Sequence, residues 1–347
     1  MGDLTNKFIK HALCNLKLRQ PSKQGDIFIF TVPRSGLTWL LEIFSRHPHT
    51  RCIKEPFGLW NISKIQNYFE PRSRYCDLSE EDFERIRRYI EDILSNKQPW
   101  KSHRASDGKY KVKTSLNVFA FSKVCNFSHW FEQVFGCRIL YLVRHPISNA
   151  LSKLNNRWYE AAYKGYQNEG WRALIEVFLE SRQFCESYLN SDLIKQSWRI
   201  LKEGNDLERY ILSWCLDNIV PIQYFRKRHW LLVSYEDLVW NSELTLQTIT
   251  EHFGLGYLKK MKQNLNLPSK SSDMCDRETI EMIRRGDKKF LVSRWRKEIS
   301  EKDIDRCFSI LKYFDIDLYC RESDLLNPKY DIYKQAHHPD FLLSQQL

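Results

Sequence analysis

The sequence predicts an α/β fold of three layers, in which a central, mainly parallel sheet of about five strands is flanked by helices. Three observations point to this class. Short apolar segments near residues 27, 51, 110, 138 and 230 have the composition of strands that are buried on both faces. Segments with apolar residues at helical spacing lie between them. The chain has 347 residues, of which 42% are hydrophobic, and this suffices for one large core.

The first strand leads into a loop within the segment DIFIFTVPRSGLTWLL, residues 26–41. Pro33 ends the strand because proline has no N–H for the ladder. The loop then supplies a cation, two hydroxyls and a glycine that lets the backbone approach an anion: Arg34, Ser35, Thr38 and Gly36. A helix over residues 38–46 would direct its N-terminal amides toward the same anion. The segment therefore predicts a phosphate or sulfate site.

This loop is not a Walker A loop. That motif requires GxxxxGK followed by Ser or Thr, whereas here one glycine follows an arginine and a serine. An ordinary ATPase is therefore disfavoured. On these residues alone, a strand, a turn and a capped helix without any ligand is an equally good interpretation.

The next elements are a strand over Arg51–Lys54, a short strand over Tyr110–Lys113 and a crossover helix over Leu116–Phe135. Glu55 directly follows the first of these strands, and Lys113 ends the second. The carboxyl ends of parallel strands meet at one edge of a sheet, where ligands of open α/β sheets bind. Both side chains are therefore candidates for that edge.

The fourth strand and the helix after it lie in GCRILYLVRHPISNALSKL, Gly136–Leu154. Residues 139–143 form the predicted strand, and Pro146 suits the first turn of a helix. Arg144 and Ser152 flank this turn eight residues apart and could hold one phosphate between them. A surface arginine and an exposed helical serine would be the better interpretation if the segment stood alone.

The remaining elements are three helices and one strand. Apolar spacing predicts helices over Trp171–Leu189, Asp206–Phe225 and Asp303–Tyr313, and a last core strand over Trp230–Ser234. We expect one domain over residues 26–320, between an N-terminal segment of residues 1–25 and a C-terminal tail of residues 321–347.

Together, PRSGLTW and VRHPISNALS resemble the sulfotransferase superfamily, whose members use 3′-phosphoadenosine 5′-phosphosulfate (PAPS) as sulfuryl donor. Two further stretches resemble its later motifs in the same order: VSYEDLV at Val233–Val239 and SRWRKEIS at Ser293–Ser300. The resemblance spans Pro33–Ser300 and implies a P-loop NTPase-like fold, PAPS as co-substrate and no metal. Its first motif would be the 5′-phosphosulfate loop and its second the 3′-phosphate site.

The resemblance also assigns residues to the nucleotide. Those around the 5′-phosphosulfate and the adenine would be Arg34, Ser35, Gly36, Leu37, Thr38 and Trp39. Arg144 and Ser152 match the pair that grips the 3′-phosphate, and Tyr235 matches an adenine contact. Further candidates for the 3′-phosphate are Ser293, Arg294 and Arg296. Leu37 stands where the family usually has threonine, so its backbone amide would have to replace a hydroxyl contact.

The chemistry requires a base for the acceptor hydroxyl, positive charge on the leaving phosphate oxygen and an in-line arrangement. Arg34 would supply the charge, and Lys113 is a second candidate unless it is a solvated surface lysine. Cytosolic small-molecule members present a histidine base in a KTHLP-like segment, where this chain has Lys113-Thr114-Ser115-Leu116. The context of Glu55 resembles the carbohydrate and tyrosylprotein branches, in which a glutamate at this place acts as base, so Glu55 is the expected base. The chain is closer to these and to the bacterial-type branch than to the members with a histidine base. The alternative for Glu55 is a structural salt bridge.

Composition bounds the partners. The formal net charge of +11 would attract an anionic nucleotide and favours an anionic acceptor, such as a sulfated or acidic glycan that carries the reacting hydroxyl. Nucleic-acid binding is disfavoured because no helix-turn-helix, RRM or zinc-finger spacing occurs. The ten cysteines include no CxxC, so we expect no metal site. The oligomeric state is left open.

The N-terminus, MGDLTNKFIKHALCNLKLRQ, lacks the apolar stretch of a signal peptide or a transmembrane anchor, and Asn6 breaks the myristoylation pattern. We therefore expect a cytoplasmic protein; a place in the Golgi lumen would require an anchor outside this sequence. Two other functions stay open at this point. One is a P-loop-type nucleotide or small-molecule kinase, and the other is a non-catalytic protein that binds sulfated glycans.

Overall fold

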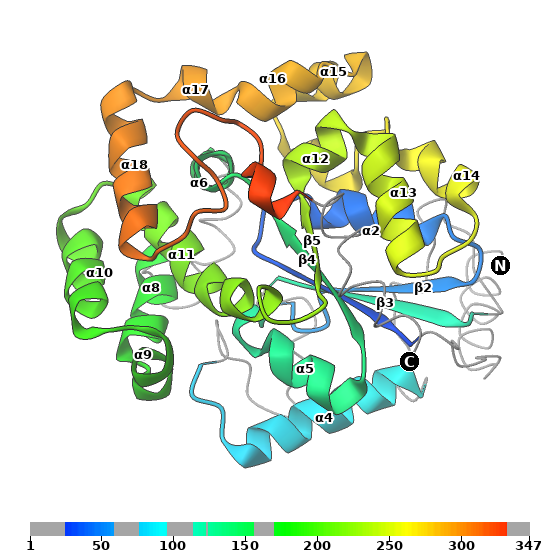
Figure 1. Cartoon of the computed structure of the whole chain (residues 1–347), viewed down its shortest axis with the longest axis horizontal. Helices are drawn as coiled ribbons and strands as arrows, with labels where there is room; N and C mark the ends of the chain where they lie inside the picture. The colour runs from blue at the N-terminus through cyan, green and yellow to red at the C-terminus, as the bar shows by residue number, and fades with distance from the viewer. Residues whose placement is uncertain (1–24, 59–75, 96–113, 123, 156–169, 332–347) are drawn as a thin grey trace, which may run out of the picture.

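The computed structural model describes residues 25–58, 76–95, 114–122, 124–155 and 170–331. Its centre is a parallel sheet of five strands in the order β2-β3-β1-β4-β5. The strands are β1 (Ile27–Thr31), β2 (Thr50–Lys54), β3 (Leu116–Phe121), β4 (Arg138–Val143) and β5 (Leu231–Ser234). Figure 1 shows helices on both faces of this sheet. The predicted fold class is confirmed.

Helices make up most of the rest. They are α2 (Leu37–Ser45), α4 (Glu80–Leu94), α5 (Ser128–Phe135), α6 (Pro146–Leu154), α8 (Gly170–Glu180), α9 (Arg182–Tyr188), α10 (Ser191–Glu203), α11 (Asp206–Phe225), α12 (Tyr235–Trp240), α13 (Ser242–His252), α14 (Leu258–Met261), α15 (Arg277–Arg285), α16 (Lys288–Ser293), α17 (Trp295–Glu298) and α18 (Glu301–Tyr313). Short 3₁₀ turns occupy Cys125–Phe127, Lys262–Asn264, Lys270–Met274 and Pro328–Tyr330. Within the described ranges, no helix is apolar over a length that would cross a bilayer.

Alternate residues of each strand serve two separate cores, as expected for a sheet covered on both faces. Ile27 and Ile29 of β1 pack with the apolar side chains of α2, α12 and α13. Phe28 and Phe30 face the opposite way and join a larger core with α4, α5 and α11. In Figure 1 the first group of helices lies above the sheet and α4 and α5 lie below it. The apolar runs read from the sequence are thus buried on both sides.

The third strand corrects one prediction. The crossover helix expected over Leu116–Phe135 is wrong in its first part, because Leu116–Phe121 is β3 and pairs with both β1 and β2. All six residues of LNVFAF are buried, and such a short apolar run does not distinguish a strand from a buried helix by its periodicity. The helix begins only at Ser128. The strand expected over residues 110–113 lies outside the described residues.

The helix expected over Trp171–Leu189 is likewise two helices, α8 and α9. Ser181 separates them, since its hydroxyl accepts the Phe184 N–H at 3.1 Å and caps the start of α9. The helix over Asp206–Phe225 has the predicted bounds. The expected helix over Asp303–Tyr313 begins two residues earlier, after the Ser300 cap.

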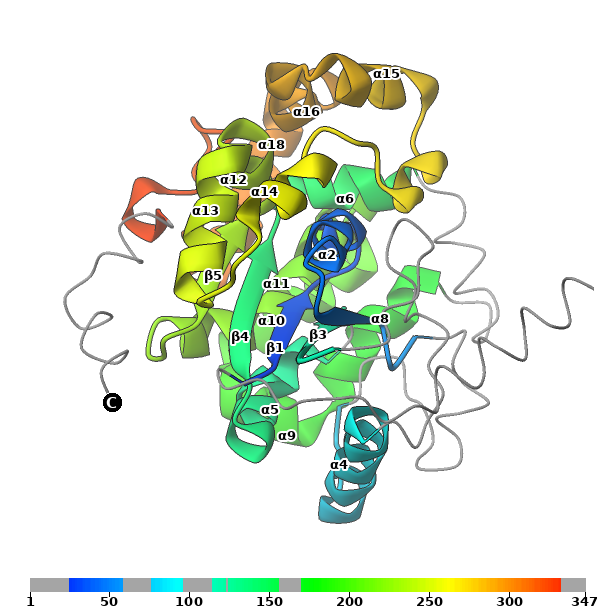
Figure 2. The ribbon, with the colours of Figure 1, turned by 90° about the vertical axis from the view of Figure 1, so that its right-hand side faces the viewer.

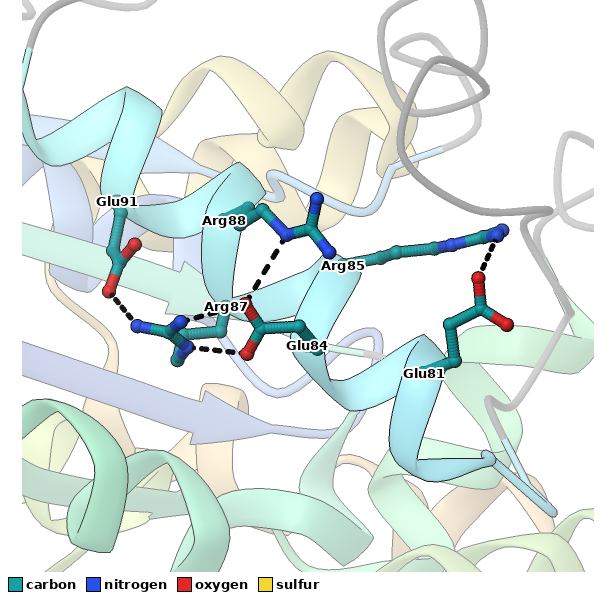
Figure 3. Close-up of polar contacts among 6 residues, drawn as sticks. All are labelled: Glu81, Glu84, Arg85, Arg87, Arg88 and Glu91. Carbon is teal, nitrogen blue, oxygen red and sulfur yellow. Dashed lines mark hydrogen bonds and ion pairs between the residues drawn. The ribbon is translucent and has the colours of Figure 1, made fainter.

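The exposed face of α4 is a ladder of ion pairs (Figure 3). Arg87 contacts both Glu84 and Glu91 at 2.7 Å, and Arg88 lies 3.3 Å from Glu84. Arg85 pairs with Glu81 one turn away. Such exposed pairs stabilise a helix by only a few tenths of a kcal/mol each. Because each of these arginines has a glutamate partner, α4 adds little to the positive surface of the molecule.

Candidate active site

The carboxyl edge of the sheet opens into a cavity of about 630 Å3. Each of the five strands delivers a lining residue just past its end: Arg34, Glu55, Ser122, Arg144 and Tyr235. After β1 the chain forms β2 and β3 on one side of β1, and then crosses to form β4 on the other side. The cavity therefore lies at the switch point of the sheet. Four of these five residues are among the predicted site residues, and Ser122 is new.

The loop after β1 has the conformation expected of an anion-binding turn. Gly36 adopts φ +90° and precedes the first turn of α2, and Arg34 is also left-handed at φ +73°. The amide of Asn149 in α6 fixes the loop, donating to the Pro33 carbonyl at 2.9 Å and to Ser35 Oγ at 3.2 Å. The fully buried Ser35 hydroxyl thus faces Asn149 and does not line the cavity. Asn149, one helical turn before Ser152, was missed from the sequence.

Two guanidinium groups and a hydroxyl come together in the lining of the cavity. Arg34 Nε donates to Ser152 Oγ at 3.1 Å, and Arg144 Nη1 donates to the Arg34 carbonyl at 2.9 Å. The Arg144 guanidinium also lies 4.5 Å over the ring of Tyr235. The loop after β1 and the Arg144–Ser152 pair, which were predicted from separate motifs, are therefore neighbours. A cluster of two cations and a hydroxyl suits an anion.

Aromatic side chains form the adjoining wall. The rings of Trp39 and Tyr235 pack edge to face with centroids 6.0 Å apart, and both line the cavity. Trp39 Nε1 donates to the Asn264 carbonyl at 3.1 Å, which fixes its indole. Leu37 and Thr38 also line this part. A flat base would find apolar ring surfaces here.

The carboxylate of Glu55, which follows β2, also lines the cavity. Its side chain is 8% exposed, and Oε2 accepts the Ser122 N–H at 3.2 Å. The backbone is left-handed at φ +48° and donates to the Ala120 carbonyl at 2.8 Å. A non-glycine residue with φ above zero is uncommon and costs on the order of 1 kcal/mol. Such conformations cluster at functional sites, and here both Glu55 and Arg34 adopt one.

Lys54, at the end of β2, is a cavity residue that the sequence did not single out. Burial lowers the pKa of its ammonium group, and the carboxylates of Glu55 and Glu42 oppose this shift. A lysine whose charge is poorly hydrated interacts strongly with an incoming anion. Lys113, the lysine that was predicted, lies outside the described residues.

Of the three candidates in the SRWRKEIS motif, only one lines the cavity. Arg294 lines the cavity but bonds Asp276 at 2.8 Å and also pairs with Glu298. Ser293 donates to the Lys289 carbonyl of its own helix at 2.8 Å, and Arg296 pairs with Asp324 at 2.6 Å. Neither Ser293 nor Arg296 lines the cavity. Their role at the nucleotide stays a prediction that this geometry does not favour.

Part of the apolar cavity wall comes from residues 265–291, which the sequence analysis left unassigned. Its members are Leu265, Leu267, Pro268, Ile283, Phe290 and Leu291. This segment follows α13 and ends before α17, so it lies between the VSYEDLV and SRWRKEIS motifs and belongs to neither. The only sequence signal is the amphipathic spacing of α15.

A model of the sulfotransferase domain matches residues 24–314. The chain belongs to the sulfotransferase family. Membership implies PAPS as the co-substrate and a hydroxyl-bearing acceptor, so this PAPS-dependent sulfotransferase is an enzyme of sulfuryl transfer. The resemblance seen in the four motifs is thereby confirmed. No curated protein is similar enough to match the chain.

Solved structures similar to this sulfotransferase include two domains of biosynthetic systems. The sulfotransferase domain of the Synechococcus PCC 7002 olefin synthase has 15% identity and a TM-score of 0.41, and covers 86% of this chain and 98% of its own. The domain from the curacin biosynthetic pathway has 15% identity and a TM-score of 0.42, with coverage of 86% and 99%. Mouse sulfotransferase SULT7A1, complexed with PAP, has 16% identity and a TM-score of 0.39, with coverage of 87% and 88%. Similarity this distant identifies no acceptor.

Gly36→Ala is expected to weaken nucleotide binding by this sulfotransferase about tenfold or more, because the cost of a left-handed alanine adds to a clash. A Cβ at Gly36 would lie 2.7 Å from Cδ2 of Tyr235, which borders the cavity. The measurement is the calorimetric affinity for 3′,5′-diphosphoadenosine (PAP).

Gly136→Ala is the matched control, since Gly136 also has a positive φ of +54° but its Cβ would meet nothing within 4 Å. It lies at the end of α5 and does not line the cavity. Equal affinities of the two variants for PAP would contradict the close approach of the loop to Tyr235.

Proposed function

We propose that this sulfotransferase moves the sulfuryl group of PAPS to a hydroxyl of a carbohydrate or glycoconjugate, with Glu55 as the base. One observation carries the proposal. The Glu55 carboxylate, after β2, lines the same cavity as the cluster of Arg34, Arg144 and Ser152, which comes from the ends of β1 and β4 and from α6. A proton acceptor and a site for the leaving anion are thus available in one cavity.

In the proposed complex, the 3′-phosphate of PAPS binds Arg144 and Ser152, and the adenine lies against Trp39 and Tyr235. The 5′-phosphosulfate lies on the Gly36 turn, where the first amides of α2 point toward it. Arg34 then exchanges Ser152 for an oxygen of the leaving phosphate. These roles use the contacts that the cavity already presents.

The reaction is an in-line displacement at sulfur. The acceptor oxygen forms a bond to sulfur while its proton passes to Glu55. The bond between sulfur and the 5′-phosphate oxygen breaks, and PAP leaves with its additional negative charge facing Arg34. Because the transition state is loose, positioning and fixed positive charge supply most of the rate. Lys54, which lines the same cavity, adds further positive charge.

A carbohydrate acceptor is proposed because the base is a carboxylate and because the chain carries a net charge of +11. Sugar hydroxyls are poor nucleophiles, so a base aligned with the attacking oxygen contributes strongly to their reaction. A positive surface would also concentrate acidic or sulfated glycans.

Calorimetric titration of the purified chain at moderate salt tests the donor site. PAP is expected to bind at least about tenfold more tightly than ATP with magnesium, because only PAP has the 3′-phosphate for Arg144 and Ser152. Preference for ATP would favour a kinase, and no binding of either would favour a glycan-binding protein without activity. Transfer from PAPS to phenols but not to any of a panel of glycans would overturn the proposed acceptor class.

A further inference from the structure

A buried carboxylate lies directly behind the nucleotide cavity. Glu236, the residue after Tyr235, is 1% exposed and does not line the cavity. Its Oε1 accepts the backbone N–H of His145 at 3.0 Å, and its Oε2 accepts the hydroxyl of Tyr319 at 2.8 Å. One side chain therefore connects the start of α12, the turn between β4 and α6, and the segment after α18.

The contact with His145 bears on the phosphate site through Arg144, its neighbour in the chain. His145 caps α6, so no helical carbonyl accepts its N–H, and Pro146 has no N–H at all. A buried amide without an acceptor costs about 1–3 kcal/mol, and Glu236 removes this cost. Any shift of the turn would move the Arg144 guanidinium away from the Arg34 carbonyl and the Tyr235 ring, which it now contacts.

The imidazole of His145 is held by packing. It stacks on Trp295 at 4.4 Å between ring centroids and meets Tyr319 edge on at 4.9 Å. Neither ring nitrogen has a hydrogen-bond partner among the residues that the structure describes. Burial and the nearby guanidinium groups of Arg296 and Arg144 lower the pKa of His145 to about 3, so the ring is neutral. Glu236 thus holds the backbone of the turn, while the aromatic rings hold its side chain.

We propose that Glu236 is a positioning residue that sets selectivity for the 3′-phosphate by fixing the turn that carries Arg144. It does not touch the donor or the reacting atoms. It affects binding by accepting the His145 N–H, and the hydrogen bond from the Tyr319 hydroxyl holds its carboxylate in place. The inference rests on the proposed nucleotide site, in which Arg144 binds the 3′-phosphate.

Glutamine is the appropriate conservative replacement. Burial raises the pKa of Glu236 to about 7, against the opposing effects of the His145 N–H, Arg144 and Tyr319. Because burial disfavours the charged form, an uncharged amide of the same shape is expected to fit this site. A glutamine amide can accept the His145 N–H through its oxygen and donate to the Tyr319 oxygen.

The test compares affinities for PAP and for adenosine 5′-monophosphate (AMP), which lacks the 3′-phosphate. Glu236→Ala is expected to lower the ratio of the two affinities about tenfold, and Glu236→Gln is expected to keep it within about threefold of wild type. Steady-state kinetics should show a raised KM for PAPS in Glu236→Ala with little change in kcat. Asp237→Asn is the matched control, since Asp237 is a partly buried carboxylate of the same turn that accepts the Ser234 hydroxyl instead.

An unchanged ratio in folded Glu236→Ala, or an equal fall in Glu236→Gln, would overturn the inference. If Glu236→Ala does not fold, Tyr319→Phe removes one of the two contacts and should lower the ratio about threefold; no change would overturn the inference. A wild-type chain that does not prefer PAP to AMP would instead overturn the proposed donor site. The two failures are therefore distinguishable.

Discussion

The Glu55→Gln variant is expected to transfer the sulfuryl group about 10²–10⁴ times more slowly than the wild type, because this is the usual contribution of a general base. Glutamine has the shape of glutamate and can still accept the Ser122 N–H, which Glu55 Oε2 now accepts at 3.2 Å. It cannot take the acceptor proton. Single-turnover transfer from PAPS measures the chemical step directly.

The affinity of Glu55→Gln for PAP should stay within about threefold of wild type, since in the proposed complex Glu55 faces the acceptor and not the nucleotide. Glu42→Gln is the matched control, because Glu42 is a partly buried carboxylate beside Lys54 that does not line the cavity. It should retain wild-type transfer. Unchanged turnover in Glu55→Gln would exclude Glu55 as the base and leave it a structural acceptor for Ser122.

Arg144→Ala is expected to weaken binding of PAP about a hundredfold, because partly buried, charge-assisted hydrogen bonds to a phosphate are lost. The affinity for AMP should fall less than about tenfold. AMP has no 3′-phosphate, so the substitution affects its binding only indirectly, through Arg34 and Tyr235. Arg144 now donates to the Arg34 carbonyl and covers the Tyr235 ring, so its removal also loosens these neighbours. Calorimetry with both nucleotides separates the two contributions.

Arg182→Ala controls for net charge in this experiment. Arg182 lies on α9, pairs with Glu186 and does not line the cavity, so its loss removes one positive charge far from the nucleotide. Its affinities for PAP and AMP should equal those of the wild type. If Arg144→Ala lowered both affinities equally, the 3′-phosphate would have to bind elsewhere.

The sheet was largely predictable because its strands are apolar on both faces. Ile27–Thr31 and Arg138–Val143 have few polar residues, and each is followed by a turn that ends it clearly. The failure at Leu116–Phe121 has the opposite cause. Apolar residues recur after it, in Cys125–Phe127 and in α5, so the pattern alone does not show where the strand ends and the helix begins. Only pairing with β1 and β2 identifies the strand.

The site was predictable where a residue follows a strand directly. Arg34, Glu55 and Arg144 come together because parallel strands end at one edge, and this follows from chain order alone. Asn149 and Glu236 could not be found in this way. Each acts through a contact with a segment distant in the sequence, and neither residue type is unusual in a helix.

The cavity wall extends along the chain from Pro33 to Glu298 and takes side chains from the ends of all five strands. A chain with any strand unpaired has no such wall, so a ligand that fills the cavity binds the native state alone. Ligand at a hundred times its Kd then adds about 2.7 kcal/mol to the free energy of unfolding. The resistance of the whole sheet to heat and proteolysis should therefore rise with the concentration of nucleotide, because the nucleotide binds only after the strands have paired.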